Sequence, residues 1–326
     1  MTADRAASDL TVAICAYTLD RWDDLSAAVA SVRAQHRPPA ELLLVVDHNP
    51  ALLERARREL PGVRVLPSEQ RRGLSGARNT ALSAARGELI AFLDDDAVAD
   101  RGWTAHLLAG YRDPRVFGVG GLVRPWWLEG RPDWFPSEFD WVVGCSYHGL
   151  PDRGSEVRNF IGANMSFRRA PALAAGGFRT DLGRVGTRPL GCEETELCIR
   201  LAVRNPGAVL RYEPSAGVRH RVPGHRGTVR YFTARCYAEG RSKAAVVRYG
   251  GAARGLSSER GYLRRTVPVA LLHSLRRGAL GRAAALCGGV ALTVAGFVAG
   301  LASRGTPPNG PTGPATAAGQ PIGDPS

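Results

Sequence analysis

The sequence lacks most signatures of small disulfide-rich, metal-finger or secreted proteins. It has six cysteines in 326 residues, and no two form a Cys-x-x-Cys pair, which argues against a zinc ribbon or a thioredoxin-type redox site. Residues 1–9 are polar, so no secretory signal precedes the first apolar run, and we expect a reduced, cytoplasmic setting. Hydrophobic residues make up 44% and charged residues 22%, which excludes wholesale disorder, collagen and a polytopic membrane protein.

Acidic residues are scarce towards the C-terminus. Positions 219–304 hold 16 basic and two acidic residues, whereas the rest of the chain holds 27 and 28. The net charge of +13 therefore belongs to one region, which favours an anionic partner such as phosphate, lipid headgroups or nucleic acid. No stretch resembles a helix-turn-helix, an RNA-binding sheet or a zinc finger, so we expect no nucleic acid.

Short apolar runs alternate with helical patterns over the first hundred residues. Such alternation is typical of parallel βαβ units in an open α/β sheet. Ligands of such sheets bind at the carboxyl ends of the strands. The expected strands are Thr11–Cys15, Glu41–Val46, Val63–Leu66 and Leu89–Leu93.

Three aspartates directly follow the last of these strands. Because side chains alternate along an extended backbone, Asp94 and Asp96 project to one side and can converge on one ion. Oxygen ligands of this kind suit Mg²⁺ or Mn²⁺, and such ions often bridge to substrate phosphates. The alternative is a solvated turn that caps a helix. Asp47 ends the second strand and fits either a hydrogen bond to a ribose or base, or a turn.

Two further segments open helices and carry charged side chains. The loop Gly73–Asn79 brings Arg78 and backbone amides to a helix start, where anionic groups bind, although it is neither a GxxxxGK[ST] nor a GxGxxG loop. Glu193 and Glu194 begin a helix, either as acids that complement its dipole or with one of them as a catalytic base. His220 follows an expected strand and is either a ligand or an ordinary hydrogen-bonded histidine.

The order and context of these motifs resemble family 2 glycosyltransferases with the GT-A fold. The resemblance runs from Thr11 to about Gly250. It implies an α/β fold with an open, mostly parallel sheet flanked by helices, and inverting transfer of a sugar from a nucleotide-diphosphate donor to an acceptor hydroxyl. The segments that carry it are Thr11–Thr18, Val45–Asp47, Gly73–Asn79, Leu93–Asp96, Asn159–Arg169, Gly176–Phe178 and Glu193–Leu197.

The resemblance also implies a role for each motif. Asp96 and Asp94 would form the Asp-x-Asp site for Mg²⁺ or Mn²⁺, and His220 would complete it. Glu194 would be the base, with Glu193 as the alternative, because the family usually has Glu-Asp at this place. The residues expected to contact the donor are Ala16, Asp47, Arg78, Asp94 and Asp95.

From Pro125 to Tyr147 the sequence becomes aromatic and irregular. The resemblance places this segment on the acceptor side, where aromatic rings stack on sugars. A satellite core under a long loop is the equal alternative. The residues expected on the acceptor side are Trp126, Trp127, Trp134, Trp141 and Asn164.

The composition marks a polar N-terminal segment, a basic helical extension and a disordered tail, and the resemblance implies a glycosyltransferase domain between the first two. Residues 283–303 of the extension carry no charge and are long enough to span a bilayer. They either span it, lie flat beside their basic neighbours or pack on the catalytic domain. We expect the extension to serve location at the inner face of the cell membrane and not chemistry, and the acceptor to be a glycan or lipid-linked. The expected regions are 1–10, 11–250 (nucleotide-binding part 11–124, acceptor part 125–250), 251–304 and 305–326.

Two other functions fit parts of the sequence. A sugar nucleotidyltransferase would need a glycine-rich, basic first turn, which Cys15–Thr18 does not offer. A non-enzymatic membrane-binding protein would use the basic region alone and would not respond to substitution of Asp96.

Overall fold

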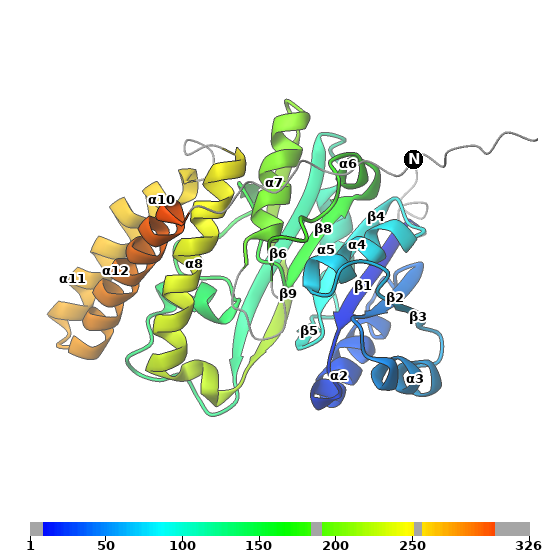
Figure 1. The fold of residues 1–326 in the computed structure, drawn as a ribbon, viewed down its shortest axis with the longest axis horizontal. Coiled ribbons are helices and arrows are strands. Elements are labelled where there is room, and N and C mark those ends of the chain that lie inside the picture. The colour runs from blue at the N-terminus through cyan, green and yellow to red at the C-terminus, as the bar shows by residue number, and fades with distance from the viewer. Residues whose placement is uncertain (1–8, 184–190, 251–255, 304–326) are drawn as a thin grey trace, which may run out of the picture.

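The computed structural model describes residues 9–183, 191–250 and 256–303, and its centre is one mixed β-sheet (Figure 1). Hydrogen bonds order the strands β3-β2-β1-β4-β8-β6-β9-β5, and β7 pairs with β9. Residues 1–8 and the tail predicted to be disordered lie outside the described residues. The strands are β1 (Leu10–Ala16), β2 (Glu41–Val46), β3 (Arg64–Pro67), β4 (Leu89–Asp94), β5 (Ala97–Ala99), β6 (Val116–Trp127), β7 (Ser155–Glu156), β8 (Asn164–Arg168) and β9 (Val209–Val222).

The N-terminal half of the sheet is parallel, as the alternating pattern predicts. The strands β3, β2, β1 and β4 run in one direction, and β2 has the predicted bounds. The helices α2 (Trp22–Arg33), α3 (Pro50–Glu59) and α4 (Leu74–Ala84) connect them. The other half is mixed, because β8 runs antiparallel to both β4 and β6. The chain reaches β8 through the irregular segment after β6 and not through a crossover helix, so the parallel pattern ends there.

Alternating side chains of the central strands supply two cores, one on each face of the sheet. Val12 and Ile14 of β1 belong to a core with residues of α2, α3 and α5 (Trp103–Gly110). Ala13 belongs to a second core with residues of α4, α6 (Arg169–Ala174) and α7 (Glu193–Arg204). Helices therefore cover both faces, and the predicted α/β architecture is confirmed.

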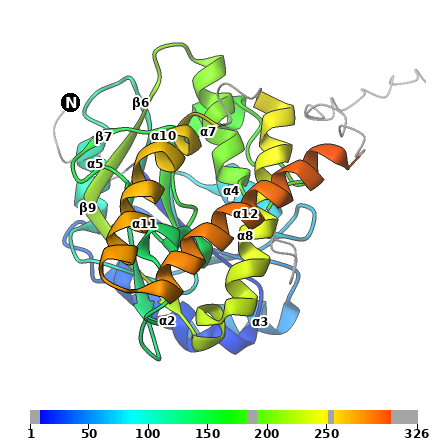
Figure 2. The same cartoon turned by 90° about the vertical axis from the view of Figure 1, so that its left-hand side faces the viewer.

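The helices after β9 form an outer layer, at the left of Figure 1 and facing the viewer in Figure 2. The last helix of the layer, α12 (Leu280–Ala302), packs very closely along its first helix, α8 (Val229–Gly250): a Cβ atom at Gly296 of α12 would lie 2.0 Å from the carbonyl oxygen of Tyr237 of α8. By length and composition the last helix is also the one in the described part of the chain that could cross a membrane. The layer consists of α8, α10 (Ser257–Gly261), the π-helical turn η4 (Tyr262–Thr266), α11 (Val267–Arg276) and α12.

Candidate active site

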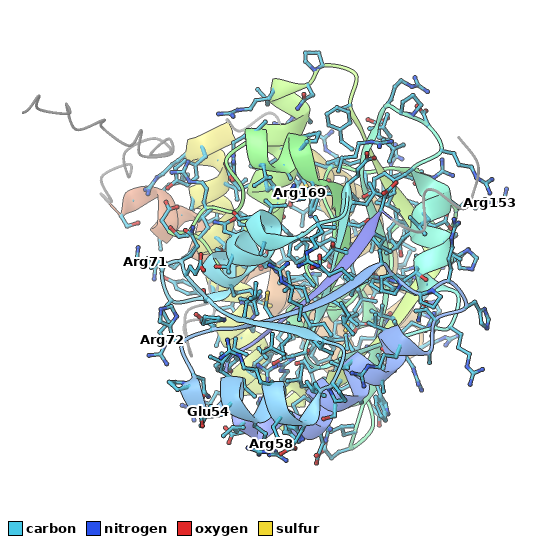
Figure 3. The ribbon with its side chains drawn as sticks, turned by 90° about the vertical axis from the view of Figure 1, so that its right-hand side faces the viewer. Glu54, Arg58, Arg71, Arg72, Arg153 and Arg169 are labelled. Atoms are coloured by element: carbon cyan, nitrogen blue, oxygen red, sulfur yellow. The ribbon has the colours of Figure 1, made fainter. Side chains whose placement is uncertain are left out.

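The carboxyl ends of β1, β2 and β4 meet at one edge of the sheet. Asp47 directly follows β2, and its N–H donates to the carbonyl oxygen of Ala16 at the end of β1 (2.8 Å). The Oδ2 atom of Asp47 accepts from the N–H of Gly73 (2.9 Å), and Oδ1 lies 2.7 Å from Nδ1 of His48. Asp47 thus orders the loop before α4. Arg71 and Arg72 of this loop reach the protein surface (Figure 3).

Asp94, Asp96 and His220 form a cluster that can hold a metal ion. One ligand atom from each side chain lies within 4.8 Å of the others, and Oδ1 of Asp96 is 3.0 Å from Nε2 of His220. The antiparallel pair β5–β9 produces this proximity, because it sets Ala97 opposite His220. Two carboxylates and an imidazole fit a divalent cation that accepts both oxygen and nitrogen ligands.

Cations surround the buried carboxylate of Asp96. Nη1 of Arg21 lies 3.0 Å from it and Nη2 of Arg226 lies 3.5 Å from it. Burial alone would raise the pKa of Asp96, but the charges of His220, Arg226 and Arg21 outweigh burial and hold the pKa below its ordinary value. Burial by itself would lower the pKa of His220, yet Asp96 raises it well above the ordinary value. The Asp96 carboxylate is therefore kept ionised and in place by these cations.

Asp95, which we expected to contact the donor, has Oδ1 2.9 Å from Nη1 of Arg21. Burial raises its pKa; Arg21 opposes that rise, whereas Asp96 and Asp94 add to it. Its Oδ2 atom has no hydrogen-bond partner among the described residues. Asp95 thus positions Arg21 beside Asp96.

Arg78 connects the aspartate motif to the start of α7. Its side chain is only 2% exposed, and Nη1 donates to Oε1 of Glu193 (2.7 Å). Nη2 donates to Oδ1 of Asp94 (3.2 Å) and to the carbonyl oxygen of Gly162 (3.0 Å). One buried guanidinium therefore fixes the distance between the two acidic motifs.

The two glutamates at the start of α7 have different surroundings. Glu193 is buried and paired with Arg78. Glu194 is partly exposed, and Oγ1 of Thr195 is 3.4 Å from its carboxylate. Loss of hydration and, second, the negative charge of Glu193 raise the pKa of Glu194. Such a carboxylate accepts a proton more readily than an ordinary surface glutamate does.

A cavity of about 1250 Å³ extends from Asp94 and His220 of the metal cluster to Glu194 at the start of α7. Ala16 and Asp47 do not line it; they lie on the other side of Asp94 along the strand ends. The C-terminal helices form part of its wall, so the extension packs on the catalytic domain, which is one of the three arrangements expected for it. The lining includes Arg78, Asp94, Glu193, Glu194, His220, Trp141, Tyr147, Tyr262, Val290 and Phe297.

The four tryptophans in the segment from the end of β6 to η2 (Ser137–Val143) have different environments. Trp141 lines the cavity, whereas Trp127 and Trp134 pack on Phe135 with ring centroids 5.1 and 5.4 Å apart. Trp126 is 44% exposed, and the guanidinium of Arg219 lies over its ring. The satellite-core interpretation therefore describes Trp127 and Trp134, and the acceptor-side interpretation fits Trp141.

Asn164 lies in the core and not on the acceptor side, where we expected it. Its side-chain NH₂ group donates to the carbonyl oxygens of Leu122 (3.1 Å) and Ala216 (2.8 Å). Its Oδ1 atom accepts from the indole N–H of Trp103 (2.8 Å). The whole amide joins β8 to its neighbours, so no polar atom is left for an acceptor.

Sequence reasoning missed Arg21 and Arg226, which flank Asp96. Arg226 follows His220 by only six positions, and that closeness was the available signal. Arg21 carried none, because it reaches Asp96 across 75 positions of sequence.

Comparison with known proteins identifies the family of this chain. Residues 11–173 match the family model described as Glycosyl transferase family 2. The chain is 34% identical over 241 residues to the glucosyl-dolichyl phosphate glucuronosyltransferase of Haloferax volcanii, covering 73% of this chain and 77% of that protein. It is 26% identical over 247 residues to the succinoglycan biosynthesis protein ExoM of Rhizobium meliloti, covering 73% and 75%.

A solved structure has a similar fold. The mannosyltransferase PcManGT from Pyrobaculum calidifontis, in complex with GDP-Man and Mn²⁺, superposes with a TM-score of 0.58 at 20% identity, covering 90% of this chain and 88% of that one. Its fold matches the α/β sheet with flanking helices described above. The family match, the relative at 34% identity and the acidic cluster lead to one conclusion: the chain belongs to glycosyl transferase family 2 and is a glycosyltransferase of the GT-A type.

Proposed function

We propose that this enzyme transfers a sugar from a nucleoside diphosphate to a hydroxyl of a glycan or lipid-linked acceptor, with inversion at the anomeric carbon and with a divalent cation. The observation that carries the proposal is the position of Arg78. Its guanidinium connects Asp94 of the metal cluster to Glu193 at the start of α7. The groups that would hold the donor diphosphate and the group that would take the acceptor proton therefore face one cavity.

The donor would lie along the strand ends. Asp47 and the backbone of Ala16 would contact the base and ribose, and Arg78 would lie near the diphosphate. A divalent ion held by Asp94, Asp96 and His220 would supply charge neutralisation of the leaving diphosphate. The imidazole among the ligands favours Mn²⁺ over Mg²⁺, since Mg²⁺ prefers oxygen ligands throughout.

Glu194 would act as the general base. The acceptor hydroxyl gives its proton to the Glu194 carboxylate while its oxygen forms a bond to the anomeric carbon. The bond from that carbon to the diphosphate oxygen breaks on the opposite side, and this in-line geometry inverts the configuration. Glu193 is less suited to the role, because its carboxylate is buried against Arg78.

The chain would then divide into a nucleotide-binding part (11–124), an acceptor part (125–250) and the helical extension from residue 251. The relative from Haloferax volcanii is named for a glucosyl-dolichyl phosphate, and this supports a lipid-linked acceptor for the present enzyme. Apolar residues of α12, Val290 and Phe297 among them, line the cavity and suit such an acceptor. These observations support a location at a membrane, and we propose its cytoplasmic face from the sequence, which favours a cytoplasmic setting.

Nucleotide binding should depend on the metal. We expect UDP or GDP to bind more tightly with Mn²⁺ than with Mg²⁺, and least tightly with a chelator, in calorimetric titrations. Asp96→Asn should weaken Mn²⁺ binding by about 100-fold, because it removes the charge of one ligand. Asp113→Asn, at an exposed surface ion pair with Arg115, is the control. Equal nucleotide affinity with Mn²⁺ and chelator would refute the metal assignment.

The pH dependence should report Glu194. Because its pKa is raised, part of the enzyme carries a protonated base at neutral pH, and kcat/KM should rise towards alkaline pH until Glu194 is ionised. Glu193→Gln removes the neighbouring negative charge, so the rise should move to lower pH. A pH profile that Glu193→Gln leaves in place would show that another group is the base.

A further inference from the structure

The outer face of α12 is apolar although solvent surrounds it. Positions three and four residues apart share one face of a helix, and on this helix every member of one such row is exposed and apolar. A surface helix of a soluble protein normally carries polar residues there. The row consists of Leu280, Ala284, Cys287, Ala291, Val294, Val298 and Leu301.

The neighbouring helix α11 continues this surface. Val269, Leu272 and Leu275 are 68%, 49% and 52% exposed. The helices α11 and α12 pack on each other and form the outermost layer of the molecule, on the side away from the parallel half of the sheet (Figures 1 and 2). We call the outer faces of α11 and α12 the apolar surface.

Arginines accompany the apolar surface without any acid between them. Residues 260–303 contain six arginines and neither aspartate nor glutamate. A second copy of the chain would bring the same positive charge to this surface and be repelled. Anionic lipid headgroups complement it, and their acyl chains match the apolar row. Five of the six side chains are exposed: Arg260, Arg264, Arg265, Arg276 and Arg277.

We propose that the apolar surface binds an anionic lipid bilayer and that α12 lies in the plane of the membrane instead of crossing it. Crossing would require α12 to leave α8, and both ends of α12 are tied to the protein. Near its start, Nη2 of Arg282 donates to the buried carboxylate of Glu138 (2.8 Å). At its end, Nη2 of Arg248 donates to the carbonyl oxygens of Gly300 (2.6 Å) and Leu301 (3.0 Å).

The flat arrangement also places the membrane beside the site. Val290, Thr293, Val294 and Phe297 of α12 line the cavity, and the apolar row of the same helix, to which Val294 also belongs, would contact lipid. One helix would then separate the cavity from the bilayer, so a lipid-linked acceptor could reach Glu194 without leaving the membrane surface. This consequence rests on the proposed function, whereas the binding of the membrane does not.

Binding to vesicles tests whether the exposed arginines recognise anionic lipid, and it does not depend on enzymatic activity. The full chain should sediment with vesicles of phosphatidylcholine and phosphatidylglycerol, and much less with phosphatidylcholine alone. Reversing two exposed arginines, Arg276→Glu with Arg277→Glu, should weaken binding by about tenfold or more. The matched control is Arg57→Glu with Arg58→Glu on α3, a helix on the side of the molecule away from α11 and α12 (Figure 1). This control should bind as the unaltered chain does. Equal loss in both pairs would overturn the proposal.

The depth of α12 distinguishes lying from crossing. Cys287 is the exposed cysteine of the six and takes a fluorophore. Burial raises the pKa of Cys15, which is partly exposed, to about 12, so few thiolates compete. Leu280→Cys and Val298→Cys, each with Cys287→Ala, place the label about 27 Å apart along the helix axis.

A helix in the membrane plane should give equal quenching at all three positions by lipids brominated at one shallow depth. Deep quenching at Cys287 with shallow quenching at the other two would show a crossing helix and refute the proposal. Two other results would also refute it: no change in fluorescence with anionic vesicles, or a dimer in lipid-free sedimentation that shields Cys287. An active enzyme in either case would leave the proposed function standing.

Discussion

Glu194→Gln is expected to lower turnover by about 10²–10⁴-fold while nucleotide affinity stays nearly unchanged. The amide keeps the shape of the side chain but cannot take the proton of the acceptor hydroxyl. Within the described part of the chain Glu194 forms no ion pair, so the substitution should leave the stability of the fold nearly unchanged. Single-turnover kinetics with saturating donor, together with calorimetric titration of the nucleoside diphosphate, would measure the two effects separately.

Glu193→Gln is the matched comparison, one position away on the same helix. We expect it to keep most of the turnover at alkaline pH and to lose stability, because Arg78 then lacks its closest counter-charge. An inactive Glu193→Gln beside an active Glu194→Gln would assign the base to the other residue. Loss of nucleotide binding in Glu194→Gln would mean that this side chain serves the donor.

Arg78→Met is expected to destabilise the folded protein by about 3–5 kcal/mol, the usual cost of breaking a buried ion pair from one side. The methionine fits the space of the alkyl chain but leaves Glu193 buried without its partner, and Glu193 Oε2 already has no hydrogen-bond partner among the described residues. Urea denaturation followed by fluorescence would measure the change in the free energy of unfolding.

The double variant Arg78→Met with Glu193→Met identifies the cause. Removing both charges should restore much of the lost stability, because no unpaired charge remains buried. Arg86→Met, at a side chain 77% exposed, should change the stability by less than about 1 kcal/mol. A double variant as unstable as the single one would mean that Arg78 stabilises the fold through packing or through Asp94.

The donor half of the fold was predictable because its signals are local. After Glu41, the run to Val46 is apolar, as a strand buried on both faces must be, and the predicted bounds Glu41–Val46 agree with those of β2. The cluster of Asp94, Asp96 and His220 was also expected: the two aspartates follow a strand that the pattern marks, and the family resemblance added His220, which lies inside β9 and not after it. The roles assigned to these residues remain predictions.

The acceptor half was less predictable because long-range contacts decide it. Nothing near Asn164 in sequence reveals that its amide joins Leu122 to Ala216. Trp134 and Trp141 look alike in sequence, but Trp134 packs on Phe232 of α8, whereas Trp141 faces the cavity. The pairing of Arg78 with Glu193 spans 115 positions and has no local signal.

The contact of α12 with residues far earlier in the chain has a consequence for biosynthesis. Domains form from the N-terminus as the ribosome releases the chain, so the parallel half of the sheet can assemble while the last helices are still being translated. The cavity wall closes only when Arg282 meets Glu138 and Gly289 packs on Phe139. A nascent chain would therefore acquire competence for the donor before it acquires an enclosed acceptor site.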